Sequence, residues 1–412
     1  MTRARPWAIA FVILANCRAS DSKDPASTTV DSAGIRITTI NTPPSALDEW
    51  TLAPTPDLTL TGAETGDSAA FAHIGSVRWL NDGRIVVVDA AANRLLLFDA
   101  SGKLVRTLGR RGEGPGEFRN VGSLTVMSGD TLLTFDGSLR RLTVWHPDVG
   151  YVRSVRVGGT SLESWPVDAW LWQGSKIVVL QLSVTARDSI PPGAGVRRWP
   201  MRARLTLQDT SGNALASSPQ FDGMYTGIYE GGDTRLPFSN QPFAAVARDR
   251  AYFGSGASFA LSYLNGDFVR AGEIRWPAQH EDLTQTEVDG VKAEAMALAA
   301  GRLPPDELAK RFAMNFDSQI LPKERPPIGR VFVDDEDQPW VERFEATRLG
   351  SRLQRAGDRW TVLSPDGDPV ARLKIPGGTR LEDVRGTRAL LVVRDSLDVQ
   401  TIAVREIVKR SR

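Results

Sequence analysis

Residues 84–118 read RIVVVDAAANRLLLFDASGKLVRTLGRRGEGPGEF and decide the fold of this 412-residue chain. Three runs rich in Val, Leu and Ile are separated by short turns that contain Asp, Asn, Ser or Gly. Runs of this kind predict β-strands, and such short turns predict that neighbouring strands pair antiparallel. A glycine-rich loop at 109–118 then leads into the next strand. The stretch therefore predicts one small antiparallel sheet joined directly to another.

The same pattern recurs along the chain at a similar spacing. Repeated small sheets of this kind predict an all-β, six-bladed β-propeller, which we place at residues 34–412. The sixth unit is one strand short, and a spare strand, GIRITTI, lies at 34–40. We expect this strand to complete the last blade and to close the ring, which removes an exposed sheet edge. The six units span residues 74–108, 121–157, 169–221, 242–276, 328–375 and 381–408.

One segment, at about 279–323, interrupts the strand pattern. Thr284 and Glu287 have the spacing of a capping box, and helix formers follow them. A second run after Pro305 has apolar residues four positions apart, as in an amphipathic helix. We therefore expect a short helical insertion between blades four and five. Its apolar face packs on the edge of the propeller or caps one mouth of the central channel.

The first unit resembles a known family. A similarity to the NHL-type repeat, and to the bacterial six-bladed β-propeller proteins that share it, is carried by Asp89, Asn93, Arg94, Phe98, Gly102 and the run GEGPGEF at 112–118. The resemblance extends over residues 70–410 and concerns the fold, because such propellers include binding proteins and enzymes alike. Propeller lactonases and lyases similar to this fold hold a metal ion on the channel axis. The resemblance therefore leaves a metal-dependent enzyme with a divalent ion in the channel as an alternative function.

The N-terminus has the features of a targeting segment. Arg3 and Arg5 precede an apolar core at 7–15, which is too short to span a bilayer as a helix. The single cysteine, Cys17, follows this core and has no partner for an internal disulfide. The arrangement resembles a bacterial lipoprotein signal in which Cys17 becomes lipidated, although Asn16 stands where a small Gly or Ala is usual.

We accordingly expect residues 1–17 to be a signal peptide and residues 18–33, which are small and polar, to be a flexible tether. The predicted protein is exported and attached to the outer or inner membrane through a lipid anchor only, facing the periplasm or the cell surface. The alternative is an ordinary secretory peptide and a soluble periplasmic or secreted protein.

The charge balance indicates the kind of partner. The formal net charge is +1, which gives no general attraction for nucleic acid. We therefore expect no role for nucleic acid. The predicted anchor, the charged loop at 109–120 and the lack of a catalytic constellation predict instead a binding or scaffold protein, which we expect to be monomeric, whose partner is a cell-envelope protein, peptide or glycan.

The loop at 109–120 predicts a ligand-facing surface, because loops between the outer strand of one blade and the inner strand of the next lie on that surface in most propellers. Its glycines permit positive φ angles, and it lacks the spacing of a phosphate-binding loop. The alternative is that Arg–Glu pairs in this loop brace blade one against blade two. The candidate ligand-face residues are Asn93, Arg94, Arg110, Arg111, Glu113, Glu117, Arg119, Asp136 and Arg140.

Metal-binding and catalytic signals are weak. Asp334, Asp335 and Asp337 belong to an acidic run, and carboxylate oxygens suit Ca²⁺. The EF-hand spacing is absent, however, and an acidic tight turn between two strands is the commoner explanation of such a run. No other cofactor is predicted. The three histidines lack zinc spacing, and no Gly-x-Ser-x-Gly elbow is present, so no catalytic residue is assigned.

Tryptophans form a further candidate site in the third unit. Trp165, Trp170, Trp172 and Trp199 lie close together in the sequence there. They pack in the core or, where exposed, present rings on which a sugar or a peptide can stack.

Overall fold

The computed structural model describes residues 26–63, 71, 73–157, 164–184, 195–229, 232–276, 281–300, 304–344, 359–395, 397 and 399–409. Five sheets, built mainly from antiparallel strands that follow one another in the chain, form six successive blades, because blades five and six share one nine-stranded sheet. The signal peptide predicted for residues 1–17, with Cys17, lies outside the described residues.

Blades one and two have the simple four-strand pattern that residues 84–118 predict. In each blade the strands pair in chain order, from the inner strand at the axis to the outer edge. The strands of blade one are β5 (Ile74–Trp79), β6 (Ile85–Asp89), β7 (Arg94–Phe98) and β8 (Leu104–Leu108). The strands of blade two are β11 (Val121–Val126), β12 (Leu132–Asp136), β13 (Arg141–His146) and β14 (Gly150–Arg156). The connecting loop contains β9 (Arg110–Arg111) and β10 (Glu117–Phe118), which pair in parallel.

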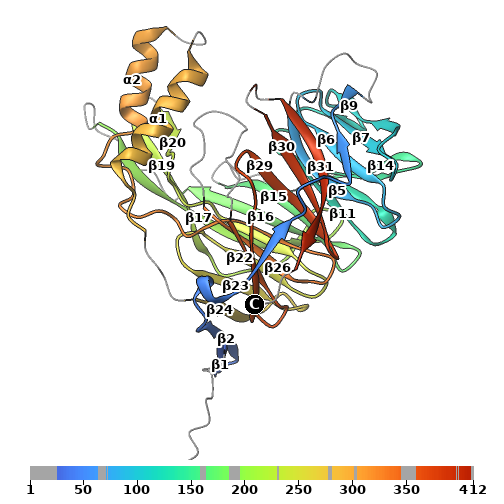
Figure 1. Ribbon diagram of the computed structural model, residues 1–412, viewed down its shortest axis with the longest axis horizontal. Coiled ribbons are helices and arrows are strands. Elements are labelled where there is room, and N and C mark those ends of the chain that lie inside the picture. Colours follow the sequence, from blue (N-terminus) through green and yellow to red (C-terminus); the bar gives the residue numbers. More distant parts are fainter. Residues whose placement is uncertain are drawn as a thin grey trace, which may run out of the picture.

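Blade three is enlarged. Four of its strands have 9 or 12 residues, and the last two strands, β19 and β20, extend toward the helices (Figure 1). The predicted unit at 169–221 therefore misses the beginning and the end of this blade. Its strands are β15 (Ser164–Trp172), β16 (Lys176–Val184), β17 (Arg197–Gln208), β18 (Ala214–Ser217), β19 (Phe221–Tyr229) and β20 (Gly232–Arg235).

Blades four, five and six each receive strands from the N-terminal part of the chain. Blade four consists of β21 (Phe243–Val246), β22 (Ala251–Gly254), β23 (Ala260–Leu264) and β24 (Arg270–Arg275), extended by β2 (Ile35–Ile40) and β1 (Ser27–Ser32). Blade five consists of β25 (Ile328–Val333), β26 (Pro339–Arg343), β27 (Arg359–Leu363) and β28 (Pro369–Lys374), extended by β3 (Asp48–Leu52). Blade six consists of β29 (Thr379–Arg385), β30 (Arg388–Arg394) and β31 (Gln400–Val408), with β4 (Leu58–Leu60) at its edge.

The strand that completes blade six is not the one that the sequence predicts. The spare strand at 34–40 is β2, and it pairs in parallel with β24 of blade four. Instead β4 supplies the missing fourth strand, pairing with β31 at Leu58, Thr59 and Leu60, while β3 pairs with the end of the same strand at Thr51 and Leu52. β4 is only three residues long, so its sequence gives a weaker strand signal than β2 does. The predicted tether at 18–33 also differs, because Ser27–Ser32 form β1 and pair with β2.

The hydrophobic core is divided into wedges between neighbouring blades. Six clusters of buried side chains each combine residues from two adjacent blades, including a cluster that joins blade six to blade one. The ring is therefore closed, and the chain folds as a six-bladed β-propeller. Large aromatics fill these wedges: Trp145, Trp340 and Trp360 are almost completely buried. Together with the turns, this packing fixes the inner strands around the axis.

The helical insertion lies between blades four and five, as predicted. It consists of α1 (Gln285–Ala299), which begins with the capping box of Thr284 and Glu287, and α2 (Pro305–Asn315). Apolar residues of both helices pack on Phe238 and Phe344, which belong to the propeller. The helices stand at the opposite end of the molecule from β1 and β2 (Figure 1).

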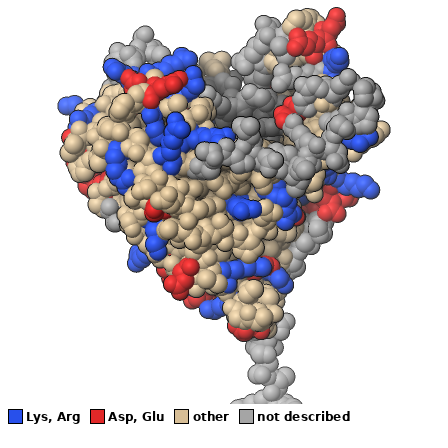
Figure 2. All heavy atoms as spheres, turned by 180° about the vertical axis from the view of Figure 1, so that it is seen from behind, with Lys and Arg blue, Asp and Glu red and all other residues tan. Residues whose placement is uncertain are grey.

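The face of the molecule drawn in Figure 2 shows little separation of charge. Basic and acidic side chains are interspersed over the face drawn in Figure 2, with uncharged residues between them. This distribution agrees with the small net charge of the chain.

Candidate functional site

A cavity of about 950 Å³ lies on the propeller axis. Residues from the inner strand of every blade line it, together with residues of the enlarged blade three. We call it the channel cavity. Its size is that of a ligand-binding pocket, and it combines apolar and aromatic side chains with a few charged ones. Trp165, Trp170, Met201 and Met224 form an apolar wall on the side of blade three.

Irregularities in the inner strands bring charged side chains to the axis. Five inner strands, β5, β11, β15, β25 and β29, show a register shift against their neighbours, typical of a β-bulge. A bulge re-aims side chains and is over-represented beside functional sites. In β15 the shift lies between Pro166 and Asp168, and in β29 it lies between Leu381 and Asp383. Asp168 and Asp383 both line the channel cavity.

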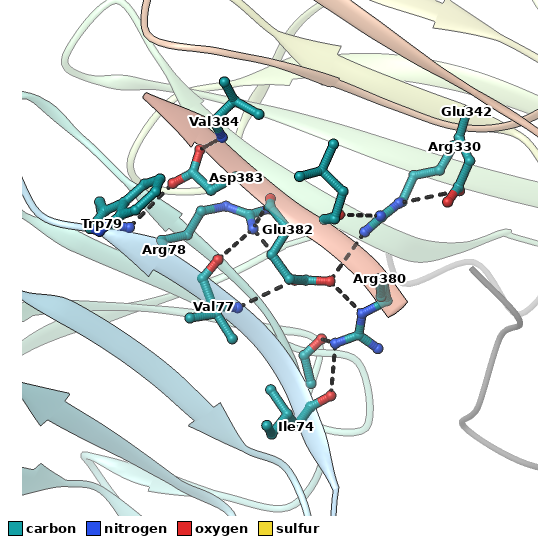
Figure 3. Close-up of polar contacts among 12 residues, drawn as sticks. Ile74, Val77, Arg78, Trp79, Arg330, Glu342, Arg380, Glu382, Asp383 and Val384 are labelled. Atoms are coloured by element: carbon teal, nitrogen blue, oxygen red, sulfur yellow. Dashed lines mark hydrogen bonds and ion pairs between the residues drawn. The ribbon is translucent and has the colours of Figure 1, made fainter. Parts of the chain in front are cut away.

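Glu382 is the centre of a buried ion-pair network beside the cavity, drawn in Figure 3. Its side chain is only 2% exposed and lies among guanidinium groups from three blades. The nearest nitrogens of Arg78 and Arg330 are 3.5 and 3.4 Å from its carboxylate, and Arg380 forms a closer ion pair. Arg330 also pairs with Glu342 at 3.5 Å. We call these five residues the Glu382 cluster.

The Glu382 cluster also bonds the inner strands of neighbouring blades to one another. The backbone N–H of Val77 donates to Glu382 Oε2 at 3.3 Å, and Arg78 donates to the Glu382 carbonyl at 2.6 Å. Arg380 donates to the carbonyl of Ile74 at 2.9 Å. Blade six is thereby held to blade one by polar contacts at the axis, in addition to the apolar wedge.

Electrostatics keep Glu382 ionised in spite of its burial. Burial alone raises the pKa of a carboxyl group, but Arg380, Arg330 and Arg78 outweigh this effect and hold the pKa of Glu382 below its usual value. Burial likewise opposes the charge of Arg330, yet Glu342 and Glu382 raise the pKa of that guanidinium. The cluster is therefore a charged network over the ordinary pH range.

Asp168 has a different environment. Its Oδ1 accepts hydrogen bonds from the Ser123 hydroxyl of β11 and from the Ala169 N–H, both at 2.8 Å. Its Oδ2 accepts none from the described part of the chain. Burial raises the pKa of Asp168 to about 6, although Ser123, Ala169 and the nearby Arg78 lower it in part. A carboxyl group with an unused oxygen and a pKa near neutrality, in a cavity, is typical of a functional site.

Further carboxylates on the cavity wall accept bonds from neutral donors. Asp383 accepts from the backbone N–H groups of Trp79 and Val384, at 3.2 and 3.0 Å. Burial raises its pKa, against the influence of Arg78. Asp334 accepts from the indole of Trp340 at 2.8 Å and from two backbone N–H groups of its own turn. Burial raises the pKa of Asp334 to about 6.

The acidic run at 334–337 forms the turn between β25 and β26. Its carboxylates point to separate partners: Asp335 accepts from the N–H of Gly386, and Asp337 pairs with Arg248 at 3.6 Å. The tight turn, which was the alternative to a calcium site, is therefore present. Within the described ranges, no group of three or more His, Cys, Asp or Glu side chains is placed to hold a metal ion. A Ca²⁺ site at this turn stays a prediction.

The predicted ligand-face residues lie elsewhere. Arg110 pairs with Glu117, and Arg119 with Glu113, both at 2.8 Å. Asp136 accepts from the backbone N–H groups of Arg119 and Asn120 and so fixes the loop to blade two. Asn93 accepts a hydrogen bond from Val121 N–H across the blade boundary. These contacts agree with the bracing role that was the alternative to ligand binding. The nine residues, none of which lines the channel cavity, are Asn93, Arg94, Arg110, Arg111, Glu113, Glu117, Arg119, Asp136 and Arg140.

The residues that the structure does bring to the axis were missed in the sequence. Arg78, Asp168 and Glu382 come singly from three different blades, so no local motif contains them. The only signal is a charged residue inside an otherwise apolar inner strand, as in SVRWL and PVDAWLW. Trp165 and Trp170, which the sequence does single out, line the cavity, whereas Trp172 is buried in the core.

A comparison of the sequence with protein-family models bears on the fold. The family model DUF5128, described as a 6-bladed beta-propeller, matches residues 58–143. No curated protein matches the sequence significantly.

In the described part of the chain, we find no helix with the length and apolar character of a membrane span.

Solved structures with a similar fold are distant in sequence. A protein described as exported, from Bacteroides fragilis, is 10% identical, with a TM-score of 0.47 over 88% of this chain and 99% of that chain. Virginiamycin B lyase from Staphylococcus aureus is 11% identical, with a TM-score of 0.39 over 84% and 86% of the two chains. Regucalcin, a calcium-binding protein from Agrobacterium tumefaciens, is 12% identical, with a TM-score of 0.38 over 88% and 97%. At these values the similarity carries no argument about ligand or activity.

Proposed function

We propose that this six-bladed β-propeller is an exported, membrane-tethered binding protein that takes a short glycan or peptide into its channel cavity. The observation that carries the proposal is the cavity itself: about 950 Å³, lined by the inner strands of all six blades. This volume suits a small ligand or a short segment of a larger one.

The chemistry of the cavity wall supports a polar organic ligand. Trp165 and Trp170 offer aromatic faces on which a sugar ring or an apolar side chain can stack. Arg78 and Asp168 stand near each other on the same wall and supply a hydrogen-bond donor and an acceptor. Export and tethering rest on the N-terminal sequence, where Cys17 is the expected lipidation site.

Blocking the channel tests this function. Thr125 lines the cavity, so a tryptophan at this position fills part of the space that a ligand needs. We expect members of a panel of short oligosaccharides and tripeptides to bind the full chain with dissociation constants below about 1 mM, measured by calorimetry. The same ligands bind the Thr125→Trp variant at least about tenfold more weakly, a loss of about 1.4 kcal/mol.

The matched control is Thr107→Trp. Thr107 is an exposed residue of β8, the outer strand of blade one, so this variant gains the same side chain far from the axis. It should bind like the wild type. If no panel member binds, or if Thr125→Trp binds as well as the control, the channel is not the ligand site.

The metal-dependent lactonase or lyase remains the alternative function. The described residues supply no observation that favours it, because the carboxylates of the acidic run face separate protein partners.

A further inference from the structure

The charges on the cavity wall are unequal. The acidic side chains that line it outnumber the basic ones by two. The acidic residues are Asp168, Asp233, Asp334, Asp335, Asp337 and Asp383, and the basic ones are Arg78, Arg248, Arg330 and Arg385.

The basic and acidic side chains on the cavity wall also differ in the partners that stabilise their charge. Arg330 is paired with Glu342 and Glu382, and Arg248 with Asp337. By contrast, Asp168 and Asp383 accept hydrogen bonds from a hydroxyl and from backbone N–H groups. Neutral donors stabilise a carboxylate but leave its charge in place. In the described part of the chain, Asp168 and Asp383 therefore have no direct ion-pair partner, although Arg78 acts on both through space and Arg385 on Asp383.

Asp168 is the carboxylate best placed to meet a ligand. Its Oδ2 has no hydrogen-bond donor in the described part of the chain, while Ser123 and Ala169 hold Oδ1 and so fix the orientation of the group. Trp165 and Trp170 belong to the same strand, β15, and line the same cavity. A carboxylate beside aromatic rings is the arrangement that binds an organic cation, through an ion pair and through the ring faces.

We propose that the channel cavity recognises a protonated amine or guanidinium group of its ligand, with Asp168 Oδ2 as the acceptor and the Trp165 and Trp170 rings beside it. The inference rests on the proposed function and specifies the ligand chemistry of the same site. Two sources of such a cation are an amino sugar with a free amine and a lysine or arginine side chain of a peptide.

Matched ligand pairs test this proposal on the full chain. The first pair is the trimer of glucosamine and the trimer of N-acetylglucosamine. The second is acetyl-Ala-Lys-Ala-amide and its norleucine analogue. We expect the charged member of at least one pair to bind about tenfold or more tightly than its neutral partner, and the pair that responds identifies the source.

The Asp168→Asn variant shows whether the preference comes from this carboxylate. Asparagine keeps an acceptor for Ser123 and Ala169 but removes the charge. We expect the charged ligand to lose about tenfold or more in affinity, while the neutral ligand changes little. Asp366→Asn, at an exposed carboxylate in a turn of blade five, serves as the control and leaves both affinities unchanged.

The pH dependence supplies an independent readout. Burial raises the pKa of Asp168 to about 6, and the charged or polar groups that face it are Arg78 of β5 and Ser123 of β11. Protonation of Asp168 removes the partner of the cation, so affinity for the amine falls as the pH drops through about 6. The Asp168→Asn variant loses this step in the profile.

Each outcome decides the question. Equal affinities within both pairs, or a preference that survives Asp168→Asn, overturns the cation assignment. If neutral ligands bind the wild type and lose affinity in Thr125→Trp, the channel is still the ligand site, and the proposed function stands without the cation assignment. Binding of CaCl₂ alone that is lost in Asp168→Asn and excludes the amine also contradicts the assignment, because it makes the site one for a metal ion.

Discussion

Replacement of Glu382 by glutamine lowers the free energy of unfolding by about 3–5 kcal/mol, the range expected when one partner is removed from a buried ion pair. Glutamine has the same shape, so packing is preserved and the effect is electrostatic. Arg78, Arg330 and Arg380 then remain close together without the carboxylate that compensates them. Chemical denaturation followed by tryptophan fluorescence measures the change.

The control for this prediction is Glu113→Gln. Glu113 also pairs with an arginine, Arg119, but both side chains are about 60% exposed, at 61% and 62%. Exposed pairs contribute about 0–1 kcal/mol, so this variant should differ little from the wild type. A loss below about 1 kcal/mol for Glu382→Gln would mean that the Glu382 cluster does not hold blade six to blade one.

The same network predicts how stability depends on pH. The pKa of Glu382 is lower in the folded protein than the ordinary value of 4.5 for a glutamate side chain. The contribution of Glu382 is therefore complete above about pH 4.5 and is lost as the pH falls through the lower, folded-state pKa. The stability difference between wild type and Glu382→Gln should accordingly be constant near neutral pH and shrink in acid.

Replacement of Leu60 by alanine costs about 2–5 kcal/mol, the usual range for deleting a buried leucine side chain. Leu60 is 1% exposed and lies in β4, the strand that completes blade six. It packs in the wedge between blades six and one, next to Gly102 of blade one, where any side chain would collide with Leu60 and Leu58. The variant therefore weakens the closure of the ring as well as the local core.

Hydrogen exchange locates the effect of this variant. β4 pairs with Ile402, Ala403 and Val404 of β31, so amides of this segment should exchange faster in Leu60→Ala. Thr59→Ala is the control, because Thr59 is exposed and lies between the two leucines. Uniform acceleration in all blades, or no change in β31, would contradict the role of β4 in closing the ring.

The blades could be predicted from the sequence because their signals are local. Strand runs and turn residues repeat along the chain, and the capping box of α1 lies within four residues, so each was recognisable without tertiary information. The strand that completes blade six and closes the ring could not be recognised from local sequence in the same way. β2 has the stronger strand pattern, whereas β4 is a strand because β31 offers it an edge.

The candidate site could not be predicted for a related reason. Arg78 comes close to Asp168 and Glu382 only after the ring forms, and the strands that carry these residues show register shifts that the sequence does not reveal. The charged loop at 109–120 has a more conspicuous sequence, but its arginines and glutamates pair with one another. The conspicuous charged loop thus forms ion pairs within itself, whereas single charged residues in apolar strands, such as Arg78 and Asp168, line the cavity.

Photo-crosslinking tests the central claim, that ligands bind on the axis, most directly. A short amine-bearing ligand from the pairs above, fitted with a diazirine group, is bound to the full chain, irradiated and mapped by mass spectrometry. The cavity predicts labels in inner-strand peptides, above all β15 (Ser164–Trp172) and β29 (Thr379–Arg385), which excess unlabelled ligand suppresses. Suppressible labels confined to the loop at 109–120 would place the ligand on the outer charged loop and contradict the account.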